Sequence, residues 1–270
     1  MIRDITIGQY YPAKSILHRL DPRLKLVGTF LFIISLFLFG DNFYGYIPVT
    51  LYLFSVIKLS KVPFKYIFKG LKAIVVLLLF TVVFNLFVTP GEVIYRLGFI
   101  KVTKEGIHSA TFMGIRLTFL ILGSSLMTFT TTPNQLTDAL EKLMWPLRHI
   151  KIPVHEISMM MSIALRFIPI LLEETDKIMK AQMARGADFE SGGVMKRAKS
   201  LVPLLVPLFV SAFRRANDLA MAMEARCYRG GEGRTKMKPL RYHRRDVMAY
   251  LTMILYITVV IAVRILRKRL

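Results

Sequence analysis

The stretch VGTFLFIISLFLFG, residues 27–40, decides the class of fold to which this sequence belongs. It contains no charged side chain, and apolar segments of about 17–25 residues cross a lipid bilayer as helices. The sequence carries further runs of this kind, and 54% of its 270 residues are hydrophobic. We therefore predict a polytopic membrane protein with an all-α fold.

Five segments have the length and the composition of membrane spans. Asp41 and Asn42 alone separate the first two, which predicts a tight helical hairpin. No small-residue cleavage site follows the first span, so we expect no removable signal peptide. The predicted spans are residues 24–40, 43–59, 71–89, 107–130 and 247–263.

The formal net charge of +21 is explained by the tendency of Lys and Arg to gather in cytoplasmic segments. The basic N-terminus and the loop with Lys58, Lys61, Lys65, Lys69 and Lys72 are both expected in the cytoplasm. An even number of spans then returns the chain to the cytoplasm after residue 130. The fifth span would leave the C-terminus outside, although the last residues, RILRKRL, are strongly basic.

Residues 132–246 differ in kind from the rest of the chain, because they hold 12 of its 17 acidic residues and 10 of its 15 methionines. They begin with a helix start signal, in which Thr132 and Gln135 form a capping box and Pro133 takes the first helical position. Apolar residues then recur at helical spacing. We predict three parts: a membrane bundle of about four spans (1–131), a cytoplasmic coupling-helix domain (132–246), and a C-terminal transmembrane helix with its tail (247–270).

Two helices of this domain are expected to end in the same pattern. QMARGADFE (182–190) and MEARCYRGG (223–231) each hold an Ala-Arg followed by a small residue. Each pattern closes an apolar helix interrupted by proline and precedes a loop with glycine. A single arginine near the C-terminal end of a helix would be explained by its favourable interaction with the helix dipole. The repetition favours two docking elements, in which a small neighbour allows close approach and the guanidinium binds a carboxylate with its fork of donors.

Ionisable residues and methionines elsewhere have structural explanations that compete with functional ones. Arg116 lies inside the fourth span, where a charge marks a functional site or pairs with a polar group for folding alone. Arg166 poses the same choice. A methionine packs a helix or forms a surface that adapts to several partners, and for the cluster at 159–161 we favour the adaptable surface.

The sequence gives little support to catalytic chemistry. It has no phosphate-binding G-x-x-x-x-G-K-[ST] motif, and the His155-Glu156 pair continues to Met159, where a zinc protease would have a second His. The single cysteine, Cys227, excludes an internal disulfide. A stand-alone membrane enzyme acting on lipid or peptide is the alternative interpretation. A basic protein that binds nucleic acid or anionic lipid is a third.

Taken together, these features resemble the transmembrane T component (EcfT, EcfT/CbiQ family) of energy-coupling factor transporters, which import vitamins and trace metals in prokaryotes. GQYYPAKSILHRLDPRLK (8–25) is similar to the N-terminal segment of that family. The coupling region of the family is matched in order and spacing by TTTPNQLTDALEKLMWPL (130–147), SIALRFIPILLEE (162–174) and AQMARGADF (181–189).

The resemblance implies specific partners and site residues. The family's T component joins two ATP-binding-cassette ATPases to a separate substrate-binding membrane protein, the S component, and each of its two motif arginines engages one ATPase. Cys227 departs from the Ala-Arg-Gly pattern of the family and lacks the backbone freedom of glycine. The ATPase-docking residues carried over are Ala184, Arg185, Gly186, Ala225, Arg226 and Cys227.

The resemblance also implies that the chain is a non-catalytic transporter subunit. It is expected to bind no cofactor, metal or nucleic acid, while ATP is used by the partner ATPases. The expected location is the cell membrane, in contact with the lipid bilayer and with residues 132–246 in the cytoplasm. A system with interchangeable, vitamin-importing S components fits better than a dedicated cobalt or nickel system.

Overall fold

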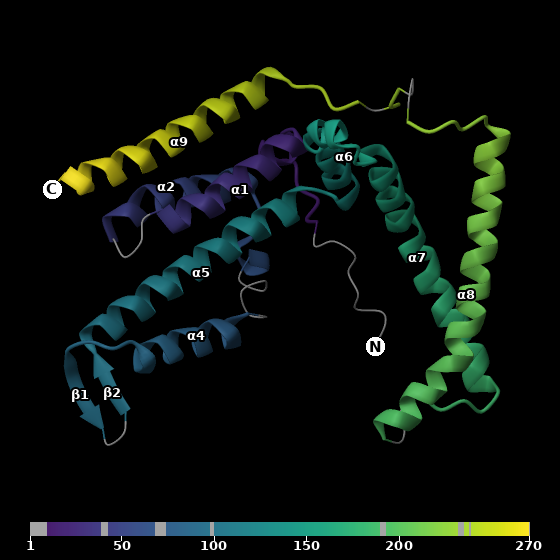
Figure 1. Ribbon diagram of the computed structural model, residues 1–270, viewed down its shortest axis with the longest axis horizontal. Coiled ribbons are helices and arrows are strands. Elements are labelled where there is room, and N and C mark those ends of the chain that lie inside the picture. The colour runs from purple at the N-terminus through teal and green to yellow at the C-terminus, as the bar shows by residue number, and fades with distance from the viewer. Residues whose placement is uncertain are drawn as a thin grey trace. The chain divides into compact units, whose positions relative to one another are not determined.

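The computed structural model describes residues 10–38, 43–67, 74–97, 100–189, 193–231, 235–237 and 239–269. These residues form two compact units (Figure 1). The membrane unit comprises residues 10–139 and 240–269, and the coupling unit comprises residues 140–239. Apart from one two-stranded sheet, every described element is helical, which confirms the predicted all-α membrane fold. The division into residues 1–131, 132–246 and 247–270 stays a prediction.

The membrane unit contains a helix at each of the five predicted spans. The predicted hairpin turn at Asp41 and Asn42 lies outside the described residues, as do Lys69 and Lys72 and the ends of two predicted spans (39–40 and 71–73). The helices are α1 (Pro22–Leu38), α2 (Phe43–Ser60), α4 (Val75–Val88), α5 (Lys104–Thr130) and α9 (Arg244–Arg269).

Four described helices are long and apolar enough to cross a membrane, namely α2, α5, α9 and α7 (Val154–Ala184). As described, α1 has 17 residues and α4 has 14. The sequence predicts that α7 lies in the cytoplasmic region 132–246. An apolar helix that packs on another helix has the same composition as a span, so length and apolarity alone do not place α7. Its cytoplasmic location stays a prediction.

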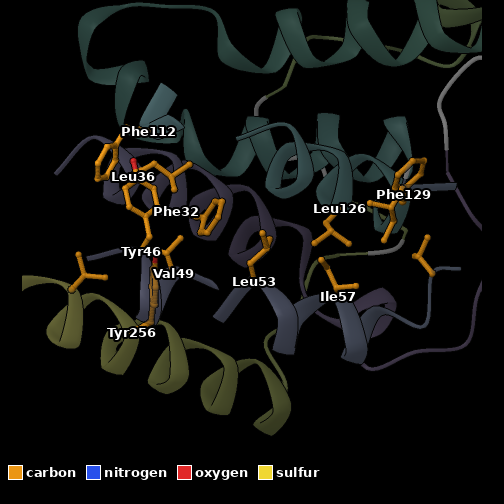
Figure 2. Packing of buried hydrophobic residues seen from close by; sticks show 13 residues of the cluster. Phe32, Leu36, Tyr46, Val49, Leu53, Ile57, Phe112, Leu126, Phe129 and Tyr256 are labelled. Carbon is orange, nitrogen blue, oxygen red and sulfur yellow. The ribbon is translucent and has the colours of Figure 1, made fainter. Parts of the chain in front are cut away.

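The core of the membrane unit is formed mainly by α1, α2, α5 and α9. Figure 2 shows Leu36 and Val49 among its buried side chains, with Tyr256 reaching in from α9. The Tyr256 ring stacks on Tyr52 with 4.2 Å between the ring centroids, and its hydroxyl lies 2.6 Å from that of Ser35. Aromatic stacking and one buried polar contact therefore hold α9 against α1 and α2.

Buried polar contacts join three helix ends at one end of this bundle. The carboxylate of Asp246 accepts hydrogen bonds from the backbone N–H groups of Asp21 (2.9 Å) and His243 (2.7 Å). The Lys25 ammonium donates to the carbonyl of Thr130 at 2.8 Å. Buried charges are tolerated when they are hydrogen-bonded in this way. The start of α1, the end of α5 and the start of α9 thus share one end of the bundle, and α9 runs from there toward the other.

Strands β1 (Val93–Leu97) and β2 (Ile100–Thr103) form an antiparallel hairpin between α4 and α5. This hairpin is not among the predicted elements, although β-branched and aromatic residues, which favour strands, are frequent there. Thr103 ends β2 and caps α5, since its hydroxyl accepts the backbone N–H of Gly106 at 3.0 Å. The hairpin is therefore coupled directly to the start of the next helix.

Helix α6 (Pro133–Leu143) begins with the predicted capping box. The backbone N–H of Thr132 donates to the Gln135 side chain at 3.1 Å, and the Gln135 N–H donates back to the Thr132 hydroxyl at 3.3 Å. Two N–H groups that the helix leaves unpaired are satisfied in this way. This detail of the prediction is confirmed.

The coupling unit is built on α7 (Val154–Ala184) and α8 (Val194–Ala225), which follow a 3₁₀ helix (Trp145–Ile150). The sequence predicts an apolar helix interrupted by proline before Arg226, and in the structure Pro203 and Pro207 both lie inside one continuous helix. The two prolines are four residues apart and share one helix face. The hydrogen bonds that they remove are therefore confined to that face.

Candidate functional site

Helix α7 ends as the sequence predicted, at the first Ala-Arg pattern. Arg185 takes the C-cap position. The backbone N–H of Gly186 donates to the carbonyl of Met183 at 2.9 Å, and that of Ala187 donates to Gln182 at 3.0 Å. This pair of bonds is a Schellman motif, which satisfies carbonyls left open at the end of a helix.

Helix α8 ends in the same way at the second pattern. Arg226 takes the C-cap position, and the backbone N–H groups of Cys227 and Tyr228 donate to the carbonyls of Glu224 (2.8 Å) and Met223 (3.0 Å). The register of the two bonds matches that at the end of α7. The two arginines therefore occupy equivalent positions in equivalent helix ends.

The residue after each arginine has a left-handed backbone. The φ angle is 88° at Gly186 and 54° at Cys227. This conformation is less stable by about 1–2 kcal/mol for a residue with a Cβ atom, because the Cβ atom lies too close to the following carbonyl oxygen. We expected Cys227 to lack the backbone freedom of glycine, and the structure shows that the Schellman motif is formed there nevertheless.

All six predicted docking residues are exposed, at the two helix ends. Neither Arg185 nor Arg226 forms an ion pair with another residue in the described ranges. An exposed guanidinium at a helix end presents its fork of N–H donors to solvent. Both helix ends are therefore available to a carboxylate of another protein.

A polar contact fixes α7 against α8 where the two helices cross. Arg215 Nη2 and Nε lie 2.9 Å and 3.2 Å from Glu174 Oε2. The hydroxyl of Ser211 donates to the other carboxylate oxygen, Glu174 Oε1. Charge-assisted hydrogen bonds are stronger than neutral ones, so this contact sets the register between the helices.

The two helices run antiparallel. The start of α7 faces the end of α8, where the hydroxyl of Tyr228 donates to the sulfur of Met159 at 3.1 Å. Between these two contacts lies an apolar groove of about 580 Å³. Its walls include Phe167 and Leu171 from α7, and Leu219 and Met223 from α8. The groove therefore lies between two contacts that join α7 to the segment from α8 onward, one at Glu174 and one at Met159.

The loop after Arg226 is anchored to the helices that precede it. The carboxylate of Glu141 accepts hydrogen bonds from the Lys236 ammonium and, at 2.9 Å, from the Ser158 hydroxyl. It also lies 3.2 Å from Nδ1 of His155. A Cβ atom on Gly231 would lie 2.4 Å from the His155 ring, so the loop packs directly on that ring.

Glu141 is ionised in this cluster at neutral pH. Its side chain is buried, and burial by itself would raise the pKa of Glu141. The hydrogen bonds from Lys236, Ser158 and His155 together outweigh this effect and lower the pKa of Glu141 below its ordinary value. The cluster therefore holds a charged acceptor, which strengthens the anchor.

The predicted docking residues include neither Glu174 and Arg215 nor the residues around Glu141. A partial signal was present, since Glu173-Glu174 and Arg214-Arg215 are the charged pairs that begin the polar end of each helix. Their contact depends on how the helices cross. Within the described ranges no group of three His, Cys, Asp or Glu residues is placed to hold a metal ion.

Arg116 pairs with aromatic residues inside the membrane unit. Its Nε donates to the Tyr46 hydroxyl at 3.2 Å, and its guanidinium lies over the Phe37 ring at 5.6 Å. These contacts join α5 to α2 and α1, which favours the folding role among the two alternatives for Arg116. Arg166 is exposed on α7.

Comparison with known proteins agrees with this architecture. A family model described as Cobalt transport protein matches residues 13–237. The chain is 55% identical over 261 residues to the energy-coupling factor transporter transmembrane protein EcfT of Ruminiclostridium cellulolyticum, covering 97% of each chain. It is 50% identical over 255 residues to the EcfT protein of Bacillus subtilis, covering 94% of this chain and 96% of that one.

The fold and these matches together define a multi-pass membrane protein of the transport class. The chain belongs to the family of energy-coupling factor transporter transmembrane proteins, EcfT. The matched relatives are transport proteins, and the membrane-enzyme alternative is not supported.

Proposed function

We propose that this chain is the coupling subunit of an energy-coupling factor importer and that its two arginine-tipped helix ends each dock one ATP-binding-cassette ATPase. The observation that carries the proposal is the equivalence of the two ends. Arg185 and Arg226 occupy the same cap position in the same Schellman motif. Two equivalent ends match two ATPase subunits.

The antiparallel arrangement supports this assignment. Because α7 and α8 run in opposite directions, Arg185 and Arg226 lie at opposite ends of the helix pair. One ATPase can therefore bind at each end without competing for the same surface. A carboxylate in a groove of each ATPase would accept the guanidinium fork, and the small residues on either side of the arginine allow the helix end to enter that groove.

The proposed mechanism couples ATP use to movement within the membrane. ATP binding closes the ATPase pair and moves the two helix ends relative to each other. Helices α7 and α8, with their exposed Met160 and Met161, pass this motion to a separate membrane-embedded S component, which carries the vitamin or metal. The chain itself holds no ATP and no other cofactor, and it supplies coupling free energy between sites on different polypeptides.

A pull-down of the ATPase pair in detergent tests the proposal. The wild-type chain is expected to retain both ATPases, and the Arg185→Ala/Arg226→Ala variant is expected to lose them. Retention of both ATPases by this double variant would show that the docking assignment is wrong. Arg214→Ala, which removes an exposed arginine away from both helix ends, is the matched control and should retain the ATPases.

A further inference from the structure

The segment between α6 and α7 carries basic residues around the only tryptophan of the chain. Lys142, Trp145, Arg148 and Lys151 recur at every third position. Residues three apart are neighbours on an α-helix, and in a 3₁₀ helix such as Trp145–Ile150 they lie directly above one another. Lys142, Trp145 and Arg148 therefore line one side of the segment, and Lys151 caps its end.

Two of these cations lie against the indole ring of Trp145. The Lys142 ammonium is 5.7 Å from the ring centre, and the Arg148 guanidinium is 5.2 Å from it. Cations within about 6 Å of an indole ring are attracted by its π electrons. Trp145 nevertheless stays 48% exposed. The two contacts therefore hold a large aromatic ring at the surface with positive charge on either side.

A second exposed apolar side chain and a lack of acidic residues complete this surface. Ile150 is 71% exposed, and the chain has no Asp or Glu between residues 142 and 155. The preceding Glu141 is buried, and its carboxylate accepts hydrogen bonds from Ser158 and Lys236. The surface thus combines exposed apolar side chains with positive charge. We call it the Trp145 patch, which consists of Lys142, Trp145, Arg148, Ile150 and Lys151.

The Trp145 patch follows a membrane span closely along the chain. Helix α5, which is long and apolar enough to cross a membrane, ends at Thr130. The element between it and the patch is α6, an amphipathic helix of 11 residues and about 16 Å. Amphipathic segments with tryptophan and cations lie along the membrane surface, where the indole sits among the headgroups and the cations reach the phosphates.

We propose that the Trp145 patch binds anionic phospholipid headgroups of the leaflet in which α5 ends. Trp145 and Ile150 enter the headgroup layer, while Lys142 and Lys151 contact the phosphates. The charge of the patch favours anionic lipid as its occupant, because juxtamembrane cations are attracted to the negative surface of such a leaflet. The contact goes beyond the proposed function and does not depend on ATPase docking.

The single tryptophan makes this contact measurable on the full-length chain in nanodiscs without partners. Two preparations contain equal amounts of phosphatidylcholine and phosphatidylglycerol, and they differ only in which of the two lipids carries brominated acyl chains. Bromine quenches tryptophan emission on contact. We expect blue-shifted emission from Trp145 and stronger quenching when phosphatidylglycerol carries the bromine. Raising the salt concentration should weaken this preference, because salt screens the attraction.

Two matched double variants test the role of the lysines. Lys142→Gln/Lys151→Gln should shift the equilibrium between the lipid-bound and the free patch about thirty-fold toward the free patch, since each cation near an anionic surface contributes about 1 kcal/mol. The stronger quenching by brominated phosphatidylglycerol should then disappear. Lys177→Gln/Lys180→Gln, which removes two exposed cations from α7, should leave it unchanged.

Three results would overturn the proposal. Emission typical of water that neither brominated lipid quenches would show that the patch does not touch lipid and is left for a protein partner. Equal quenching by the two brominated lipids would show that the anionic headgroup is not selected. Equal losses in the two double variants would assign the effect to the overall charge of the coupling unit. ATPase docking is tested separately, by the pull-down with Arg185→Ala/Arg226→Ala.

Discussion

Cys227 holds the same left-handed backbone position after Arg226 that Gly186 holds after Arg185. The hydrogen bonds around the two residues also have the same register. The two helix ends therefore share a backbone geometry although their sequences differ at this position. The geometry of the helix end, rather than the presence of glycine, is what the two sites have in common.

Replacing Cys227 with Gly is expected to stabilise the second helix end by about 1 kcal/mol, because glycine does not pay the steric cost of positive φ. Hydrogen exchange of the Tyr228 amide, which donates to Met223, should slow about five-fold, the equivalent of this free energy. Gly186→Ala should have the opposite effect at the first end. Faster exchange in Cys227→Gly would contradict the prediction.

Arg226→Ala is expected to weaken binding of one ATPase by about 1.5–3 kcal/mol, the contribution of a hydrogen bond to a charged group. Arg226→Lys should recover only part of this loss, because lysine keeps the charge but not the planar fork. Titration of the purified chain with ATPase measures both effects. Arg229→Lys, at an exposed site in the following loop, is the control. Equal binding by wild type and Arg226→Lys would mean that charge alone is recognised.

Glu141→Gln is expected to release the loop after Arg226, at a cost of about 1–3 kcal/mol, because three hydrogen bonds to a carboxylate are weakened. The measurement is proteolysis or hydrogen exchange of residues 228–231 and 235–237. Glu156→Gln, at an exposed neighbouring site, should leave the loop protected. Equal protection of the loop in both variants would show that Glu141 does not hold it in place.

The same anchor should fail in acid. The pKa of Glu141 is lowered from its ordinary value of 4.5 in the folded chain, so its contribution to stability is complete above that value. The contribution is lost as the pH falls through the lowered pKa. Loop protection should therefore persist at pH 5 to 6 and decline below pH 4.5. In Glu141→Gln this acid transition should be absent.

Ser35→Ala should destabilise the membrane unit more than Tyr256→Phe. Ser35 already donates its hydroxyl proton to the carbonyl of Phe32 at 2.6 Å, so the tyrosine is the donor in the pair. Removing the serine leaves a buried donor unpaired, at about 1–3 kcal/mol, whereas removing the tyrosine hydroxyl takes away only one bond. Thermal unfolding in detergent measures the difference, with exposed Ser55→Ala as the control. The opposite order would contradict the donor assignment.

The contact between Asp21 and Asp246 predicts a membrane topology that chemical labelling can test. With the shared end of α1 and α9 in the cytoplasm, a cysteine at Arg267 should react with an impermeant maleimide in intact cells. A cysteine at Lys199, in α8, should react only after permeabilisation. Both are placed in a Cys227→Ser background. Labelling of the Arg267 site only after permeabilisation would mean that α9 does not cross the membrane.

Features that depend on nearby residues could be predicted from the sequence. The capping box of Thr132 and Gln135 involves residues three positions apart, and Gly186 ends α7 through bonds that reach back only a few residues. The spans were predictable for a similar reason, since a bilayer core requires long apolar helices whatever their neighbours. The Ala-Arg patterns at both helix ends were visible for the same reason.

The sequence by itself therefore determined a helical membrane protein, its coupling helices and the two arginines that end them. Only the tertiary structure decided that Glu174 pairs with Arg215, 41 residues away, and that Lys236 binds Glu141, 95 residues away. It also decided that Cys227 adopts a left-handed backbone. Helical periodicity indicates which face of a helix is apolar, but the angle and register at which two helices cross depend on the packing of both.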